Sequence, residues 1–288
     1  MYIMLLSSIA AASLNSVVLK KANASKPENV FFLNLIVSFI WCVLLFIANK
    51  GHLSTNPEVM FWGILYGITQ TVFILFKTAA MSTGSVTVTT LIGNSSLLIS
   101  IAVSLIVWKE TVTAFDIIGL ALLLIAIFLC TYTKGSAKSS DYAPSWKYFA
   151  LFFLLSAAGV GIVFKAFGKS GNLEYCGDMM FISSVVMIIS NLAICFFTGC
   201  LKAEKIAAHE RSFVVFAVLS GILSCLYNRL NVFLTGNMDA LIFFPSFNGG
   251  VVFLSAVLSA FICGEKLGKS RILGLAVGIF AICVIGIL

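Results

Sequence analysis

The sequence predicts an all-α integral membrane protein with ten transmembrane helices, arranged as two inverted five-helix repeats. Three observations carry this prediction. The chain is 60% hydrophobic and only 10% charged, whereas a soluble globular domain carries about 25% charged residues. Its apolar residues fall into runs close to the roughly 20 residues that a membrane-spanning helix needs. A short pattern that closes the first half of the chain also returns near the end of the second half.

The five apolar runs of the first half are bounded by charges and by helix-capping residues. Asn56, Pro57 and Glu58 have the order of an N-cap, a first-turn proline and an acid at the positive helix end. Thr113 and Asp116 have the spacing of a capping box. The predicted helices are Tyr2 to Leu19, Val30 to Ala48, Asn56 to about Ala80, Val86 to Trp108, and Thr113 to about Tyr132.

A polar segment, residues 134–146, separates the two halves, so the predicted domains are residues 1–133 and 147–288. Both halves have a short polar joint after their third helix, at Ser82–Ser85 and Thr235–Asp239. Because each half has an odd number of spans, the second half should enter the membrane in the opposite direction, as in many secondary transporters. The predicted helices of this half are Lys147 to Phe167, Tyr175 to Thr198, Ser212 to Leu234, Asp239 to Cys263, and Ser270 to Leu288.

The repeated pattern is a glutamate at the end of one helix followed by a glycine in the next. Glu110 precedes Gly119 at the same spacing as Glu265 precedes Gly274. Several apolar residues after each glycine also match, which indicates an internal duplication. We expect the two glutamates to pack the ends of the repeats together; the alternative is that they carry protons.

Basic residues predict the orientation. Most lie in loops on the side opposite the chain ends, whereas four are assigned to the side of the chain ends: Lys50, Lys109, Lys165 and Lys169. The positive-inside rule then places both chain ends outside the cytoplasm.

The third predicted helix carries a stripe of aromatic and polar residues. Trp62, Tyr66, Gln70, Phe73 and Lys77 are spaced by four, four, three and four residues, so they share one helix face. Polar groups inside a span usually face protein or water. Two interpretations of Lys77 stay open. It holds an anionic group of a substrate in a cavity, or it extends from the helix end to the membrane interface.

The eighth predicted helix has a matching stripe that contains Tyr227, Asn228 and Asn231, with Arg229 one position off it. We place Arg229 in the same cavity, with the membrane interface as the alternative. Asn94 and Asn248 lie mid-span at similar depth and either bind a ligand or join neighbouring helices. The predicted substrate-binding residues are Trp62, Tyr66, Gln70, Lys77, Asn94, Tyr227, Asn228, Arg229, Asn231 and Asn248.

The sequence argues against catalysis and against nucleic acid as a partner. Gly168-Lys169-Ser170-Gly171 matches the GxSG pattern of intramembrane serine proteases, but the only histidines, His52 and His209, lie in predicted loops. A serine without a base in reach is not a nucleophile. Metal, disulfide and phosphate-loop spacings are absent, so we expect no catalytic residue, metal site or cofactor. The net charge of +7 is dispersed between apolar runs, which does not fit a nucleic-acid surface.

The duplicated pattern also resembles a known family. Over its whole length the chain resembles the EamA-like members of the drug/metabolite transporter superfamily. The residues that carry the resemblance are Glu110 with Gly119, Glu265 with Gly274, and Ala79-Ala80 before Ser82-Thr83-Gly84-Ser85. The resemblance implies alternating access by rocking of the halves around a central cavity, transport of small metabolites such as amino acids, and no ATP site. It also implies chain ends in the cytoplasm, contrary to the prediction from the basic residues.

The sequence departs from the family pattern at three positions. Asn34 stands near the start of the second helix, where many members carry arginine, and Leu97 and Val252 stand where a proline is often found. We therefore expect a secondary transporter in a bacterial cytoplasmic membrane, moving a small polar metabolite that is anionic or amino-acid-like. We expect membrane lipid to surround the protein. Whether it uses a coupling ion, and whether it is a monomer or a homodimer, are left open. The alternatives are a passive channel, a membrane scaffold without transport, and a lipid-modifying enzyme, for which no titratable pair at one depth is found.

Overall fold

A computed structural model describes residues 1–21, 27–51, 54–83, 89, 92–110, 112–131, 143–199, 211–263 and 269–286. Secondary structure in these ranges is helical. The elements are α1 (Tyr2–Lys21), α2 (Pro27–Ala48), α3 (Pro57–Thr83), α5 (Ser96–Trp108), α6 (Ala114–Thr131), α7 (Trp146–Lys169), the 3₁₀ helix η2 (Leu173–Tyr175), α8 (Cys176–Thr198), α10 (Arg211–Asn237), α11 (Ala240–Cys263) and α12 (Lys269–Gly286).

Within the described part of the chain, seven helical segments are long and apolar enough to cross a membrane. Three further apolar stretches are shorter, at Ile92–Trp108, Ala114–Leu129 and Ile272–Ala281. An α-helix rises 1.5 Å per residue, so these fall below the roughly 20 residues that a bilayer requires. Seven spans are therefore found where ten were predicted, and the shorter stretches correspond to the fourth, fifth and tenth predicted helices.

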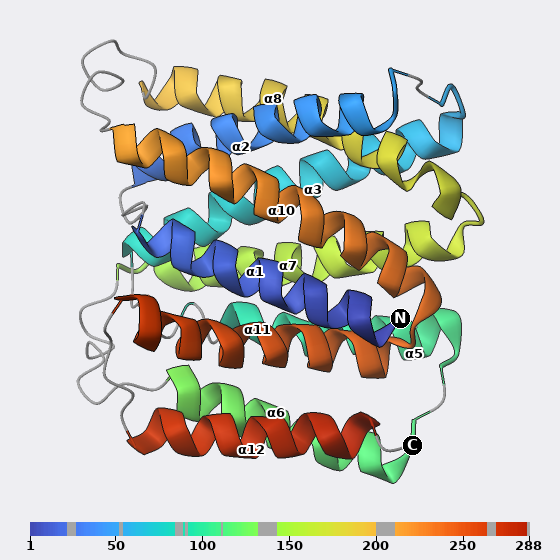
Figure 1. Cartoon of the computed structure of the whole chain (residues 1–288), viewed down its shortest axis with the longest axis vertical. Helices are drawn as coiled ribbons and strands as arrows, with labels where there is room; N and C mark the ends of the chain where they lie inside the picture. The colour runs from blue at the N-terminus through green and yellow to red at the C-terminus, as the bar shows by residue number, and fades with distance from the viewer. Residues whose placement is uncertain are drawn as a thin grey trace.

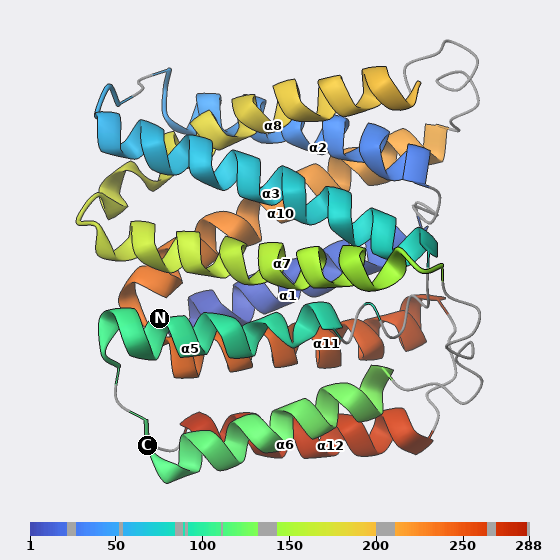
Figure 2. The same cartoon turned by 180° about the vertical axis from the view of Figure 1, so that it is seen from behind.

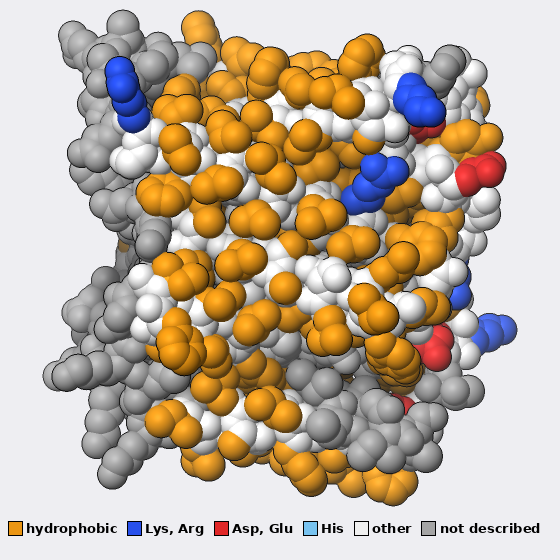
Figure 3. Space-filling model, viewed as in Figure 1, with side chains coloured by type: hydrophobic (Ala, Val, Ile, Leu, Met, Phe, Trp, Pro, Cys, Tyr) orange, Lys and Arg blue, Asp and Glu red, His pale blue; other side chains and the backbone are white. Residues whose placement is uncertain are grey.

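The outer surface of the bundle is apolar. Hydrophobic side chains spread over the part of the face that Figure 3 draws in colour, with few charged side chains among them. Phe196, Phe197 and Phe261 expose 75%, 85% and 85% of their area. In water, apolar surface of this extent would drive association, whereas lipid tails solvate it. The surface is that of an integral membrane protein.

The helices lie side by side in a stack, with α6 and α12 paired at one end (Figures 1 and 2). Helices from the two halves of the chain pack against each other throughout. Thus α1 contacts α10 and α11, whereas α7 contacts α3 and α5. In the same way, α2 contacts α8 and α10, and α8 also contacts α3.

The two halves of the chain start from opposite sides of this stack. α1 begins on the side where α12 ends, at the right of Figure 1. We name this side the terminal face and the other side the opposite face. α7 begins on the opposite face, and the joint between α10 and α11 lies on the terminal face (Figures 1 and 2).

Two predicted helix starts are confirmed by their hydrogen bonds. Asn56 Oδ1 accepts from the Glu58 backbone N–H at 2.9 Å. The Asp116 backbone N–H donates to Thr113 Oγ1 at 3.2 Å, and the Thr113 backbone N–H donates to Asp116 Oδ2 at 2.8 Å. Both arrangements satisfy backbone donors that lack a partner at a helix start.

The third and eighth predicted helices run further than expected, and the joint between α10 and α11 is therefore shorter than predicted. α3 continues through Thr83, whose hydroxyl donates to the Ala79 carbonyl at 2.7 Å. α10 continues to Asn237, and the Thr235 hydroxyl donates to the Asn231 carbonyl at 2.9 Å. A threonine that bonds to its own helix in this way does not end it, which is why the polar residues were misread. Gly84, Ser85 and the repeated Glu265 lie outside the described residues.

Candidate functional site

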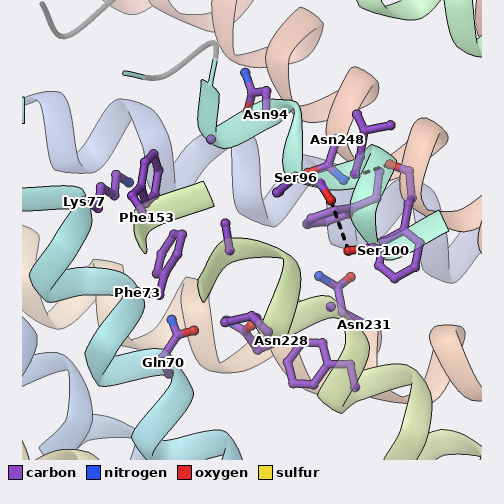
Figure 4. Close-up of a pocket in the computed structure, with 18 of the residues that line it drawn as sticks. Gln70, Phe73, Lys77, Asn94, Ser96, Ser100, Phe153, Asn228, Asn231 and Asn248 are labelled. Atoms are coloured by element: carbon purple, nitrogen blue, oxygen red, sulfur yellow. Dashed lines mark hydrogen bonds between the residues drawn. The ribbon is translucent and has the colours of Figure 1, made fainter. Parts of the chain in front are cut away.

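A cavity of about 340 Å³ lies between the two halves of the chain (Figure 4). Its walls come from α3 and from residues 93–100 in the first half, and from α7, α10 and α11 in the second half. This volume lies within the range of pockets for small molecules. Seven predicted site residues line it: Gln70, Lys77, Asn94, Tyr227, Asn228, Asn231 and Asn248.

The wall formed by α3 carries the lysine. Gln70, Phe73, Lys77 and Met81 line the cavity and, at spacings of three and four, share one helix face. Lys77 Nζ lies 5.6 Å from the centre of the Phe73 ring, within the range of a cation–π contact. Figure 4 shows Lys77 beside Phe73 and Phe153. Within the described ranges, no carboxylate forms an ion pair with Lys77.

The wall formed by α10 and α11 carries three asparagines whose amides are held by the protein. Asn228 Nδ2 donates to the Ser224 carbonyl at 2.8 Å, and its Oδ1 accepts from the Tyr66 hydroxyl at 3.3 Å. Asn231 Oδ1 accepts from the Ser8 hydroxyl at 2.6 Å. Asn248 Nδ2 donates to the Phe244 carbonyl at 2.9 Å. These bonds leave Asn231 Nδ2 as a donor and Asn248 Oδ1 as an acceptor for a molecule in the cavity.

Two residues of the α3 stripe do not line the cavity. Tyr66 is fully buried and contacts two lining residues, Asn228 through its hydrogen bond and Phe164 through its ring, at 4.6 Å between ring centres. Trp62 lies about 12 Å from Gln70 along the helix, at a rise of 1.5 Å per residue. Its indole packs edge-on against Phe61 and against the apolar core around Val59. The stripe was predicted correctly as one helix face, but the cavity covers only its second half.

The prediction that Arg229 lines the cavity is wrong. Its side chain is exposed on α10, away from the cavity residues of that helix. Successive helix residues turn by about 100°, which puts position 229 roughly 150° from the middle of the face formed by Tyr227, Asn228 and Asn231. Asn228 and Asn231 did not indicate where the Arg229 side chain points, because residues one or two positions apart in a helix do not face each other.

The aromatic walls were missed by sequence reasoning. The cavity is also lined by apolar and small residues that include Phe153, Ala157, Gly161, Phe164, Phe243, Phe244, Phe247, Ser96 and Ser100. In an apolar helix, a phenylalanine that faces a cavity and one that faces lipid look alike. The available signal was the spacing of Phe153, Ala157, Gly161 and Phe164, which follows one face of α7.

A buried ion pair lies between the cavity and the terminal face. Lys165 is fully buried, with its Nζ 2.6 Å from Glu110 Oε1, and it donates to the Met238 carbonyl at 2.7 Å. Glu110 Oε2 accepts from the Ala240 backbone N–H at 2.9 Å, at the positive end of α11. The assignment of Lys165 to the flanking charges of the terminal face is therefore wrong. Glu110 ties the end of α5 to α7 and to the joint between α10 and α11.

The same layer contains a close contact between two backbones. A Cβ at Gly236 of α10 would lie 2.8 Å from Gly168 Cα of α7, and a Cβ at Gly168 would collide with Gly236 Cα. Phe167 and Thr235, next to these glycines, are fully buried. Phe164 and Asn231 line the cavity one turn earlier in the same helices. The cavity is therefore closed toward the terminal face.

Groups that could hold a metal ion were also sought. In the ranges that the structure describes, no cluster of three or more His, Cys, Asp and Glu side chains has a suitable arrangement. Gly168 of the GxSG pattern serves in helix packing, and the Ser170 hydroxyl donates to the Phe167 carbonyl at 2.8 Å. The two histidines, His52 and His209, lie outside the described residues.

Comparisons with known proteins agree with this architecture. The EamA-like transporter family matches residues 1–132, which confirms the resemblance for that first half of the chain; this family belongs to the drug/metabolite transporter superfamily. A protein solved by crystallography has a similar fold, with a TM-score of 0.74 and 13% sequence identity, covering 99% of this chain and 97% of that chain. At this identity the likeness shows the fold alone. No curated protein matches the sequence.

Proposed function

We propose that this chain, whose residues 1–132 belong to the EamA-like transporter family, is a secondary transporter that moves a small polar metabolite by alternating access. The observation that carries the proposal is the cavity itself, in which amides and a lysine from both halves of an apolar bundle surround one space. Polar groups at this depth are costly unless they meet a partner. A substrate that is anionic or amino-acid-like would provide it.

The helix contacts support an inverted repeat of five spans per half, ten in all. Each helix of the first half has a counterpart in the second: α1 and α7, α2 and α8, α3 and α10, α5 and α11, α6 and α12. Exchanging the counterparts converts the contact of α1 with α10 into that of α7 with α3, and the contact of α1 with α11 into that of α7 with α5. The opposite directions of α1 and α7 (Figure 1) fit the same relation.

One departure from this exchange symmetry supports alternating access. α7 packs against α10, but α1 and α3, their counterparts, make no comparable contact over the described residues. The α7–α10 contact closes the terminal face at Gly168 and Gly236. We propose that the reverse state parts α7 from α10 and brings α1 to α3 on the opposite face. Glu110 belongs to the first half and Lys165 to the second. In this change their ion pair either breaks or moves as a unit.

In this proposal, the seven lining residues predicted from the sequence contact the substrate, and Tyr66 positions Asn228. No step needs ATP, because substrate or coupling-ion gradients drive a secondary transporter. The native site is a bacterial cytoplasmic membrane, with lipid against the exposed phenylalanines.

Counterflow in proteoliposomes tests the proposal. A thermal-shift screen of the purified protein against amino acids, organic acids, nucleosides and organic cations first selects a ligand. Vesicles preloaded with that unlabelled ligand should then accumulate the labelled ligand transiently and saturably. Asn231→Ala should slow this exchange, whereas Arg229→Ala, on the exposed side of the same helix, should not. Flux that does not saturate would indicate a channel, and absence of flux a scaffold; either result rejects the carrier.

A further inference from the structure

We infer that the transported molecule binds as an organic monoanion with an apolar body and no ammonium group, its anionic end on Lys77. This inference rests on the proposed function and narrows its substrate class. It follows from the charge, the hydrogen-bonding capacity and the apolar walls of the cavity, taken together.

The charge of Lys77 is not balanced by the protein. The side chain lines the cavity on α3 and lies against the Phe73 ring, which offers only a weak electrostatic partner. By contrast, Lys165, which is fully buried in the described bundle, has Glu110 at 2.6 Å. A cation in a membrane interior is costly without a counter-charge. A negatively charged ligand therefore gains most from this site.

A positive group on the ligand would find no equivalent partner. Among the described residues that line the cavity, none is an aspartate or glutamate. The acceptors that the cavity offers are neutral: they include the amide oxygens of Gln70, Asn94 and Asn248, and the Asn228 oxygen, which also accepts from Tyr66. An ammonium carries a full charge and three donors, so neutral amides compensate its desolvation poorly. The site therefore disfavours amino-acid zwitterions and organic cations.

The donors suit a carboxylate. Asn94 Nδ2 is buried in the lining without a hydrogen-bond partner in the described structure, and Asn231 Nδ2 is also left to donate. A single lysine matches one negative charge better than the two charges of a phosphate monoester. A bidentate phosphate site would favour an arginine, and Arg229 lies outside the cavity.

The remaining walls suit an apolar body. Phe153, Phe164, Phe244 and Phe247 line the cavity from α7 and α11. Phe73 and Phe153 lie with their ring centres 5.4 Å apart, and Phe243 and Phe247 are stacked at 5.7 Å. Such rings add hydrophobic contact area to a small number of polar groups, which is the usual composition of a ligand pocket. A cavity of about 340 Å³ holds a molecule the size of a phenyl-substituted short-chain acid.

Four probes that share a phenyl ring and a three-carbon chain test the inference: 3-phenylpropanoate, phenylalanine, 3-phenylpropanamide and 3-phenylpropylamine. Binding is measured on the purified full chain by calorimetry, at a pH where the amine is charged. The carboxylate should bind about tenfold or more tightly than each of the other three, as expected for a hydrogen bond to a charged group. Lys77→Met should remove this preference, and Lys77→Arg should keep it.

Lys147→Met is the matched control. Lys147 is exposed on α7 and lies 5.5 Å from the Tyr148 ring, so it repeats the cation–π contact outside the cavity. Its loss should leave all four affinities unchanged. Lys77→Gln replaces Lys77→Met if the latter fails to elute as a monodisperse protein.

The same probes separate this inference from the transport proposal. Tighter binding of phenylalanine or the amine than of the carboxylate, no binding of the carboxylate, or an unchanged preference in Lys77→Met overturns the inference. Counterflow of phenylalanine alone would leave the transporter in place and reject the monoanion. Selective binding of the carboxylate without counterflow would reject transport and leave the binding class standing.

Discussion

Lys165 shows how much a single buried charge depends on its neighbours. Its side chain has no exposed surface, and it contacts both Glu110 and the Met238 carbonyl. Taking both charges out of water costs several kcal/mol per ion, and their attraction recovers this only with good geometry. Removing one partner is therefore more damaging than removing both.

We expect Lys165→Met to destabilise the protein more than the double change Lys165→Met with Glu110→Gln. The single change leaves the Glu110 carboxylate, 9% exposed, with the Ala240 N–H but without its cation. The expected loss is about 3–5 kcal/mol, and the double change should recover most of it. Thermal unfolding in detergent measures the order of the three proteins. Lys169→Met, exposed one turn further along α7, is the control and should unfold with the wild type.

Equal midpoints for the single and double variants would show that the pair is not energetically coupled. In that case Glu110 would hold the α11 start through the Ala240 N–H alone, and the ion pair would have no part in closing the terminal face.

The sequence identified the chemistry of such residues better than their positions. Gln70 and Lys77 were placed on a cavity because a period of three and four in an apolar helix is a direct physical signal. Lys165 and Arg229 are both single cations near the ends of apolar runs, so sequence alone could not separate them. Lys165 is buried because the residue that follows α5, Glu110, and the α10–α11 joint pack over it. Arg229 is exposed because no described element covers that side of α10. The difference in burial between Lys165 and Arg229 therefore depends on tertiary contacts alone.

At the scale of elements, glycines decide which helices can approach each other. Gly63 and Gly67 let α3 lie against α8, where added Cβ atoms would come within 2.8 Å of Ile182 and 2.7 Å of Val186. Gly168 and Gly236 do the same for α7 and α10, with backbone meeting backbone. The added Cβ atoms at Gly63 and Gly67 would also meet the backbone carbonyl oxygens of Met179 and Ser183, each at 2.8 Å. A backbone cannot rotate away from an intruding methyl group, so both contacts exclude a larger residue.

We expect Gly236→Ala to hold the terminal face open. The added methyl would meet Gly168 Cα and its carbonyl oxygen, each at 2.8 Å, and overpacking of this kind costs about 1–3 kcal/mol. The state in which α7 and α10 are parted avoids this cost. A single cysteine at position 100, on the cavity wall, reports the change when the eight native cysteines are replaced by alanine. A membrane-impermeant maleimide added at the terminal face should label it faster than in the parent protein.

Gly159→Ala is the matched control on α7. Its Cβ would meet only Thr69 Cγ2, at 3.2 Å, a side-chain methyl that can yield. Labelling in this variant should stay at the parental rate. Unchanged labelling in Gly236→Ala, in a protein that still binds its ligand, would show that the glycine contact is not a gate.

Helix boundaries were predicted correctly where residues within one helical turn determine them. The starts of α3 and α6 follow from Asn56 and from the Thr113–Asp116 box, which act within one turn. The ends of α3 and α10 were misplaced because Thr83 and Thr235 bond to their own helices. Pro245 lies inside α11 without ending it. As the sixth residue of α11, Pro245 removes one hydrogen bond, the one to the Leu241 carbonyl, and such a loss can kink a helix without ending it.

At the scale of the whole molecule, the notable feature is an incomplete symmetry. Most helix contacts of the two halves correspond over the described residues. The departures are the packing of α7 against α10, which α1 and α3 do not match, and the contacts of α11 with α6 and α12, which α5 does not match. In the proposed inverted repeat, the two five-helix units have the same order of elements, so either unit can adopt either packing. If one half takes the conformation of the other, the closed and open faces exchange. Access then alternates without any change in the secondary structure.

This relation predicts that the two faces are coupled. Cysteines at Leu19 and Ser82, in the last turns of α1 and α3, should cross-link weakly in a background without native cysteines, because the described parts of α1 and α3 make no contact comparable to that between α7 and α10. Adding Gly236→Ala, on the far side of the bundle, should raise the yield, since parting α7 from α10 should bring α1 to α3. The yield is read as a mobility shift after treatment with a short bifunctional thiol reagent.

A control variant distinguishes coupling of the two faces from a general loosening of the helix packing. Gly159→Ala should leave the cross-link at its parental level, because it does not obstruct the closed face. A general loss of packing would instead raise cross-linking in both variants and lower their unfolding temperatures together. If Gly236→Ala opens the terminal face to maleimide but leaves the Leu19–Ser82 cross-link unchanged, the two faces move independently. The molecule would then work as a gated pore, because a carrier requires that one face closes when the other opens.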